Sequence, residues 1–276
     1  MLRKVKMFIW YFKAVRSIRA MVWVTVLAII RIPRKHAPGI NKAKLLADIT
    51  TKLCEKEITM HTVYGTFNGN LSIVANINPL MEQNIYHLMM ENYERNKGRK
   101  RIFVNAGAHI GRYLIDMTKN FGYESYGFEP TPETFKYLKK NIFLNGVMDK
   151  AHAFNFGLGD KDDIIDFYQS SVSGFNTFCE DQKVLNTEKI QVPIKRFDDL
   201  DLKIETKDVA LVLMDTEGFE YYVLGGMKEF LKKLNDVDII VEIHEACEKK
   251  GIIVEMMQKM GYDANPIDTG NWLFRR

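Results

Sequence analysis

Apolar runs of strand length alternate with segments of helical spacing from residue 101 onward. RIFVNAGAHIGRYLIDMTKNFG has the pattern of a strand, a glycine turn and a helix, and ESYGFEP has that of a second strand. PETFKYLKKNIFLNG follows as a helix, with Pro132 at its start and Gly146 at its end. Further strands are expected in AHAFNFGLGD, IDFYQSS, LVLMD and DVDIIVEIH, and a last strand pair in GYDANPIDTGNWLFRR. This alternation predicts a doubly wound α/β sheet over residues 101–276.

Residues 41–100 have a different pattern, which predicts a small N-terminal cap. NKAKLLADITTKLCEKE has helical spacing, and the Asn68-Gly69 pair in TVYGTFNGNLSIVANI lies between alternating apolar residues, as in a β-hairpin. Helical spacing returns over residues 80–96. A chain of 276 residues with 46% hydrophobic content can bury one main core together with such an appendage.

Charge is divided unequally along the chain. Residues 1–47 carry eleven Lys and Arg and no acid, whereas the rest carries 28 basic and 35 acidic residues. A basic arm of this kind indicates an anionic partner surface. The three cysteines are far apart and form no metal-binding pattern, so we expect neither a disulfide framework nor a zinc site, and a reducing compartment.

The first 38 residues combine this positive charge with bulky apolar side chains, in MFIWYFKAVRSIRAMVWVTVLAII. The unbroken apolar stretch Ala20–Ile30 is eleven residues long, which makes about 16 Å of helix and is too short to span a bilayer. A secretory signal is disfavoured because no small-residue cleavage site follows the apolar stretch. The alternative to a membrane anchor is a helix that packs on the body of the protein or on a partner subunit. We expect residues 1–35 to bind an anionic membrane surface, which places the protein in the cytoplasm on the inner membrane face.

Polar and small residues follow the expected strands of the main domain, where open α/β sheets bind their ligands. They are Asn105, Glu129, Gly157 and Asp215. A dinucleotide site needs G-x-G-x-x-G, but this turn is G-x-x-x-G, from Gly107 to Gly111. Glu129 lies 22 residues after Gly107, where a carboxylate can accept both hydroxyls of a ribose.

The charges at this edge indicate the rest of the ligand. No Lys or Arg stands in the glycine turn to hold a phosphate, and Arg112 instead opens the next helix. LVLMDTEGFE places Asp215, Glu217 and Glu220 within six positions after an apolar strand. Because carboxylates favour a sulfonium and an α-ammonium, a nucleoside with positive charges fits, and S-adenosylmethionine is such a ligand.

The motifs VNAGAHIG, GFEP, NIFLNG, VPIKRFDDL, LVLMDTEGFEYYVLGG and IIVEIH resemble, in order and spacing, the FkbM-type S-adenosylmethionine-dependent methyltransferases. The resemblance covers about residues 100–276. It implies a class I methyltransferase (Rossmann-like) fold of seven strands with the last antiparallel, and O-methylation of hydroxyls on sugars or polyketide-like metabolites. It also implies that Asn105, Gly107 and Gly111 form the cofactor loop, that Glu129 holds the ribose, and that Asp215 lies beside the methionine portion. Asn105 and His109 stand where the family usually has Asp and Asn, which removes one negative charge near the cofactor.

Methyl transfer to a hydroxyl needs a group that accepts the hydroxyl proton. The candidates are His244, favoured by its intrinsic pKa, and Glu217 or Glu220, favoured by their placement. His244 as a structural residue, Glu242 as a buried partner, and a divalent metal held by the acids remain alternatives. We expect no metal.

The same residues bear on other functions. The fourth strand ends in DTEGFE rather than in the Asn/Asp-Pro-Pro-aromatic block of base methylation, so nucleic acid is disfavoured as a partner. A dinucleotide-dependent oxidoreductase and a non-catalytic membrane-associated scaffold remain open. We expect an O-methyltransferase that acts on a sugar hydroxyl, on a lipid-linked or surface glycan or a related small metabolite.

Overall fold

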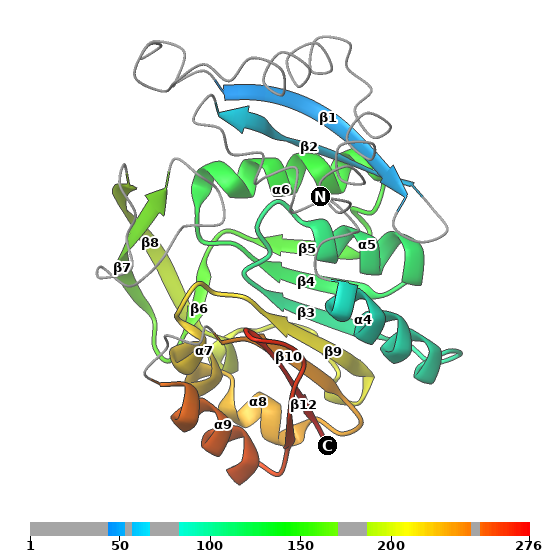
Figure 1. Cartoon of the computed structure of the whole chain (residues 1–276), viewed down its shortest axis with the longest axis vertical. Coiled ribbons are helices and arrows are strands. Elements are labelled where there is room, and N and C mark those ends of the chain that lie inside the picture. Colours follow the sequence, from blue (N-terminus) through cyan, green and yellow to red (C-terminus); the bar gives the residue numbers. More distant parts are fainter. Residues whose placement is uncertain (1–43, 53–56, 67–82, 171–186, 244–248) are drawn as a thin grey trace.

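The structure, a computed structural model, describes residues 44–52, 57–66, 83–170, 187–243 and 249–276 (Figure 1). Its centre is a seven-stranded sheet of order β11-β12-β10-β9-β3-β4-β5. The strands are β3 (Ile102–Ala106), β4 (Glu124–Phe128), β5 (Ala151–Phe154), β9 (Val209–Met214), β10 (Asp238–Glu242), β11 (Asp263–Pro266) and β12 (Asn271–Arg275). β3, β4, β5, β9 and β10 run parallel, and β12 is antiparallel to both of its neighbours. The expected doubly wound sheet with an antiparallel last strand is confirmed.

Helices cover both faces of this sheet (Figure 1). One side carries α4 (Gln83–Arg95), α5 (Arg112–Phe121) and α6 (Pro132–Leu144), and the other carries α7 (Glu220–Gly226), α8 (Lys228–Lys233) and α9 (Lys250–Lys259). Successive strand residues point to opposite faces, so that Phe103 packs with the first group of helices and Val104 with the second. Because both faces are buried, the strands are continuous apolar runs, such as VALVLM in β9.

A separate three-stranded sheet follows β5, in the order β6-β8-β7. It consists of β6 (Gly157–Gly159), β7 (Asp163–Ser170) and β8 (Thr187–Arg196), and the short 3-10 turns Phe197–Asp199 and Thr206–Asp208 lead from it to β9. The strand expected in AHAFNFGLGD is therefore divided in two, and Gly157 begins β6 rather than following a strand of the main sheet. The Asn155 side chain between them donates to the carbonyl oxygens of Glu129 and Pro130, at 2.9 and 3.2 Å. A Cβ on Gly157 would lie 2.6 Å from Ile194 Cδ1, so glycine permits the close packing of β6 on β8.

The expected helix near residues 41–57 is wrong. β1 (Lys44–Lys52) and β2 (Glu57–Thr66) form an antiparallel hairpin, which lies beside α6 (Figure 1). Each strand satisfies the backbone hydrogen bonds of the other, and the consecutive β-branched residues Ile49, Thr50 and Thr51 favour strand over helix. Asn68-Gly69 lies outside the described residues, whereas the helix expected over residues 80–96 is confirmed by α4.

The membrane-binding segment expected at residues 1–38 also lies outside the described residues. Within the part of the chain that the structure describes, no helix is both long enough and apolar enough to cross a membrane.

The glycine turn after β3 meets the end of β9 at very short range. Gly107 has a φ of 81°, and a Cβ built on it would lie 1.7 Å from the carbonyl oxygen of Asp215. The Asp215 N–H in turn donates to the Ala106 carbonyl at 3.0 Å. Glycine is therefore required here for two reasons, the left-handed backbone and the absence of space.

Gly107→Ala is expected to destabilise the fold by more than about 4 kcal/mol, because backbone atoms of β9 would have to move. Gly98 is the matched control, since its φ is 82° and a Cβ on it meets nothing within 4 Å. Gly98→Ala should cost only about 1–2 kcal/mol, the strain of the left-handed backbone alone. Urea unfolding of both variants measures the difference, and equal losses would contradict the proposed close approach.

Candidate active site

Three loops meet at the carboxyl edge of the sheet. The strand register pairs Ala106 with both Phe128 and Met214, so β3, β4 and β9 end at the same level. The N–H groups of Gly107 and Ala108 both donate to the Phe128 carbonyl, at 3.0 and 2.9 Å, and tie the first loop to the second. The structure therefore brings together the residues that follow these strands, Gly107, Glu129 and Asp215, as the sequence predicted.

Glu129 links two of these loops through its side chain. It is only 6% exposed, and its two carboxylate oxygens accept hydrogen bonds from the backbone N–H groups of His109 and Thr131, at 3.0 and 2.9 Å. Burial raises the pKa of Glu129 to about 7, although both hydrogen bonds favour the ionised form. A carboxylate has about four acceptor positions, so Glu129 can hold the loops and still accept hydroxyl groups of a ribose.

The glycine turn itself carries no positive charge that would oppose a cationic ligand. His109 has a φ of 49°, and burial lowers its pKa to about 4, so the imidazole is neutral at physiological pH. Asn105 is buried at the end of β3. Arg112, which follows the turn, is buried against Tyr86 and Tyr113, and its Nε donates to Tyr86 Oη at 3.0 Å.

The turn after β9 is shaped by Glu220. This residue is 1% exposed, and its Oε1 accepts hydrogen bonds from Thr216 N, Thr216 Oγ1 and Gly218 N, at 3.1, 3.0 and 3.1 Å. A carboxylate at the start of a helix that collects backbone N–H groups stabilises the turn. Glu220, one of the acids considered as a proton acceptor, thus has a structural role in DTEGFE.

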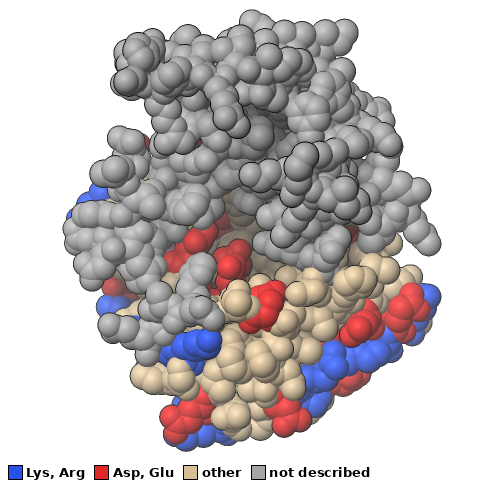
Figure 2. Space-filling view, in the orientation of Figure 1, with Lys and Arg blue, Asp and Glu red and all other residues tan. Residues whose placement is uncertain are grey.

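Glu217 is the residue of this turn with the most unusual environment. Its φ is 54°, a left-handed conformation that non-glycine residues rarely adopt. Burial, and then the charges of Asp215, Glu220 and Glu129, raise the pKa of Glu217 to about 9. These acids are therefore electrostatically coupled, and Figure 2 shows acidic side chains gathered over the carboxyl ends of the central strands. A site that resists another negative charge favours a cationic ligand.

His244 and Glu242 are two further candidate residues. His244 lies outside the described residues, so its role stays a prediction. Glu242 ends β10 and is partly rather than fully buried. Within residues 83–170, 187–243 and 249–276 and the β1–β2 hairpin, no group of three His, Cys, Asp or Glu is placed to hold a metal ion.

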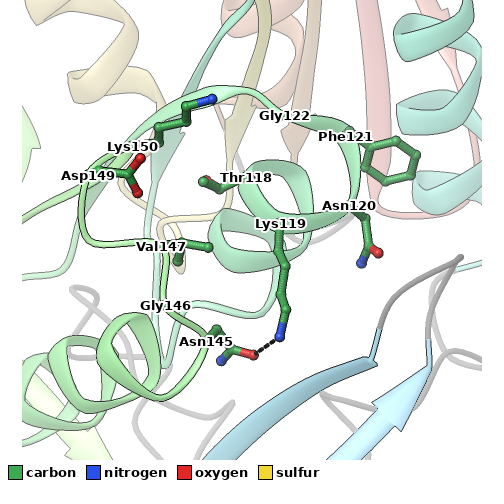
Figure 3. A pocket seen from close by; sticks show the side chains of 10 residues that line it. All are labelled: Thr118, Lys119, Asn120, Phe121, Gly122, Asn145, Gly146, Val147, Asp149 and Lys150. Atoms are coloured by element: carbon green, nitrogen blue, oxygen red, sulfur yellow. Dashed lines mark hydrogen bonds between the residues drawn. The ribbon is translucent and has the colours of Figure 1, made fainter.

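A cavity of about 490 Å³ lies at the opposite edge of the sheet (Figure 3). The carboxyl ends of α5 and α6 line it, and the Lys119 ammonium donates to Asn145 Oδ1 at 3.2 Å, with Asp149 and Lys150 on the other side. Helix carboxyl ends carry partial negative charge, which lysines offset. This cavity shares no residue with the acidic turns and is not the candidate active site.

The strand order, the buried acid after β4 and the acids after β9 define a class I methyltransferase. The sequence model of the Methyltransferase FkbM domain matches residues 105–264, and the chain belongs to this family of S-adenosylmethionine-dependent methyltransferases. The family resemblance noted on the motifs is thereby confirmed.

Three relatives are about equally similar to this chain. It is 28% identical over 166 residues to Methyltransferase 1 of Beauveria bassiana, and this match covers 54% of this chain and 65% of that protein. It is 28% identical over 172 residues to the hexuronic acid methyltransferase AglP of Haloferax volcanii, with coverages of 62% and 66%. It is also 28% identical over 143 residues to the 2-O-methyltransferase NoeI of Sinorhizobium fredii, with coverages of 47% and 56%. The matched region thus spans less than two thirds of each of these relatives.

Among solved structures, the N-terminal domain of human METTL16 in complex with SAH is similar at a TM-score of 0.39 and 16% identity. The match covers 71% of this chain and 69% of that chain.

Sequence reasoning missed the residues that support the site. Thr216 and Thr131 were not considered, although their N–H groups fix Glu220 and Glu129. The available signal was the i, i+4 spacing of Thr216 and Glu220 on either side of a glycine. No local sequence pattern indicates the contact of Arg112 with Tyr86, because the two positions are 26 residues apart.

Glu217→Gln is expected to stabilise the protein in a pH-dependent way. Because the folded pKa of Glu217 is about 9 and the unfolded value is near 4.5, the unfolded chain releases a proton that the folded chain keeps. The stability contribution of Glu217 therefore falls as pH rises between these values. The Tm of the variant should exceed that of the wild type at pH 8 and match it at pH 4.

Glu220→Gln is the control, since it disturbs the hydrogen bonds of the turn. It should lower the Tm at both pH values. A Tm difference for Glu217→Gln that does not depend on pH would contradict the assigned environment.

Proposed function

We propose that this protein transfers the methyl group of S-adenosylmethionine to a hydroxyl of a sugar or a related metabolite. The observation that carries the proposal is the meeting of Glu129, Asp215 and Glu217 where β4 and β9 end beside β3, an arrangement in which the acids oppose one another's ionisation and a positive charge would be favoured. The relatives AglP and NoeI support the acceptor class, because their names describe a hexuronic acid methyltransferase and a 2-O-methyltransferase.

The residues at the sheet edge fit such a donor. Glu129 would accept the ribose hydroxyls, and the turn from Gly107 to Gly111, with Asn105 and His109, would lie along the nucleoside. Asp215 would pair with the α-ammonium. Gly157 was expected in the same set, and its place in β6, close to Pro130, puts it beside the loop after Glu129. When bound, the donor supplies an electrophilic methyl group on a cationic sulfur.

Positioning and proton transfer are what this chain would contribute to catalysis. Methyl transfer is an in-line displacement, so holding the acceptor oxygen against the methyl carbon supplies much of the rate. The hydroxyl proton then needs a base, for which Glu217 and His244 are the candidates. Positive charge beside Glu217 would lower its pKa and so increase the fraction of the carboxylate that is ionised and available to accept a proton.

Glu129→Ala is the variant that tests donor binding. It removes the expected ribose acceptor and the link between His109 and Thr131, so the affinity for S-adenosylmethionine measured by calorimetry should fall at least tenfold. Glu133→Ala, an exposed acid in the first turn of α6, is the matched control and should bind normally. Transfer of labelled methyl groups to a panel of uronic acids and oligosaccharides tests the acceptor class. A wild-type protein that binds no donor would instead support the non-catalytic scaffold.

We also propose that residues 1–35 hold the enzyme on an anionic membrane surface, on the cytoplasmic face. Their eleven-residue apolar stretch and the absence of acids support this role.

Removal of residues 1–35 should lower the fraction of protein that sediments with phosphatidylserine vesicles. The full chain should sediment less as salt rises, because screening weakens the basic residues' attraction to lipid. Vesicles of neutral lipid are the control. Sedimentation that is unchanged by the deletion would refute the anchor.

A further inference from the structure

The carboxyl end of α6 presents an unusual concentration of exposed apolar side chains. Six large apolar side chains are exposed in the part of the chain that the structure describes, and three of them lie within residues 143–148. These are Phe143, Leu144 and Met148, which are 64%, 38% and 59% exposed and which we call the α6 tip. Exposed apolar side chains that are close together, unlike single ones, indicate a contact surface.

Exposed lysines precede and follow the α6 tip along the chain. Residues 136–150 contain four lysines and one acid, Asp149, although the chain beyond residue 47 has seven more acidic than basic residues. Lys136, Lys139 and Lys140 are on the exposed side of α6, and Lys150 is exposed after the turn. Lys119, at the end of α5, comes close enough to donate to Asn145 (Figure 3). The carboxyl end of α6 and the turn after it thus combine exposed apolar side chains with an excess of positive charge.

We infer that the α6 tip docks on an anionic lipid bilayer. Phe143, Leu144 and Met148 would enter the boundary between head groups and acyl chains, where burial of apolar area supplies affinity. The surrounding lysines would lie at the level of the lipid phosphates and be attracted by the negative surface potential. Long lysine side chains can reach the head groups while their stems cover apolar surface.

The positive charge near the α6 tip disfavours two other occupants. In a symmetric dimer the same surface faces itself, which would set the lysines of one copy against those of the other. The chain's own N-terminal segment is also basic, with eleven Lys and Arg and no acid over residues 1–47, and would be repelled in the same way. An anionic surface complements both the lysines near the α6 tip and the basic N-terminal segment.

The test is a double substitution in the full chain, Phe143→Ser with Met148→Ser. Partitioning onto vesicles that contain phosphatidylserine should fall at least tenfold. The matched control is Ile164→Ser with Ile252→Ser, two isoleucines on β7 and α9 that are 65% and 51% exposed, and this variant should partition like the wild type. All four positions are exposed, and thermal unfolding checks that both variants are folded.

Both variants keep residues 1–35, so the difference between them reports on the α6 tip and not on the N-terminal segment. Equal partitioning of the two variants, or a wild type that binds no vesicles, would overturn the inference. A change of oligomeric state in light scattering without loss of vesicle binding would assign the patch to a contact between copies and overturn it as well. Methyl transfer to a soluble acceptor is measured separately, so loss of vesicle binding and failure of the proposed enzyme activity are distinguishable.

Discussion

The close approach of β3 and β9 is the constraint on which the candidate site depends. Gly107 lies so near the Asp215 carbonyl that no side chain can stand between them. This contact joins the turn that resembles a nucleoside loop to the turn that carries the acids. Because the backbones are hydrogen-bonded at the same point, the two turns have one relative position, which is what a preorganised site needs.

The acids of the site have different tasks because their surroundings differ. Glu220 accepts three hydrogen bonds from the backbone and hydroxyl of its own turn. Glu129 holds two loops together and keeps acceptor capacity for a ligand. Glu217 has a strained backbone, and its acidic neighbours oppose its ionisation. The sequence DTEGFE looks like a simple concentration of charge, but its two glutamates differ: Glu220 stabilises the turn, and Glu217 is held largely un-ionised by its surroundings.

Much of the fold was predictable because its signals are local. Strand and helix periods, Pro132 at the start of α6 and Gly146 after its end depend on a few neighbouring residues, and the main sheet followed from them. The hairpin at β1 and β2 was missed because pairing between strands overrode the helical spacing of one of them. The local pattern of AHAFNFGLGD predicts one strand. In the structure the Asn155 side chain donates to the Glu129 carbonyl, and the segment is divided there into β5 and β6.

The candidate site was predictable in its residue types and their strand positions but not in its electrostatics. Asn105, Glu129 and Asp215 could be placed from the ends of apolar runs. The pKa shift of Glu217 depends on burial and on charges from three other residues, and the structural role of Glu220 depends on where the chain turns. Such properties arise only when the chain is folded.

The direction of α6 has a consequence for the shape of the acceptor. The helix begins three residues after Glu129 and its thirteen residues lead to the opposite edge of the sheet, a rise of about 20 Å. If a bilayer contacts the carboxyl end of α6, the candidate active site at the other end of the helix lies one helix length away from the membrane, in water. A sugar attached directly to a lipid would be out of reach there, whereas the outermost unit of an extended head group, or a freely diffusing saccharide, would not.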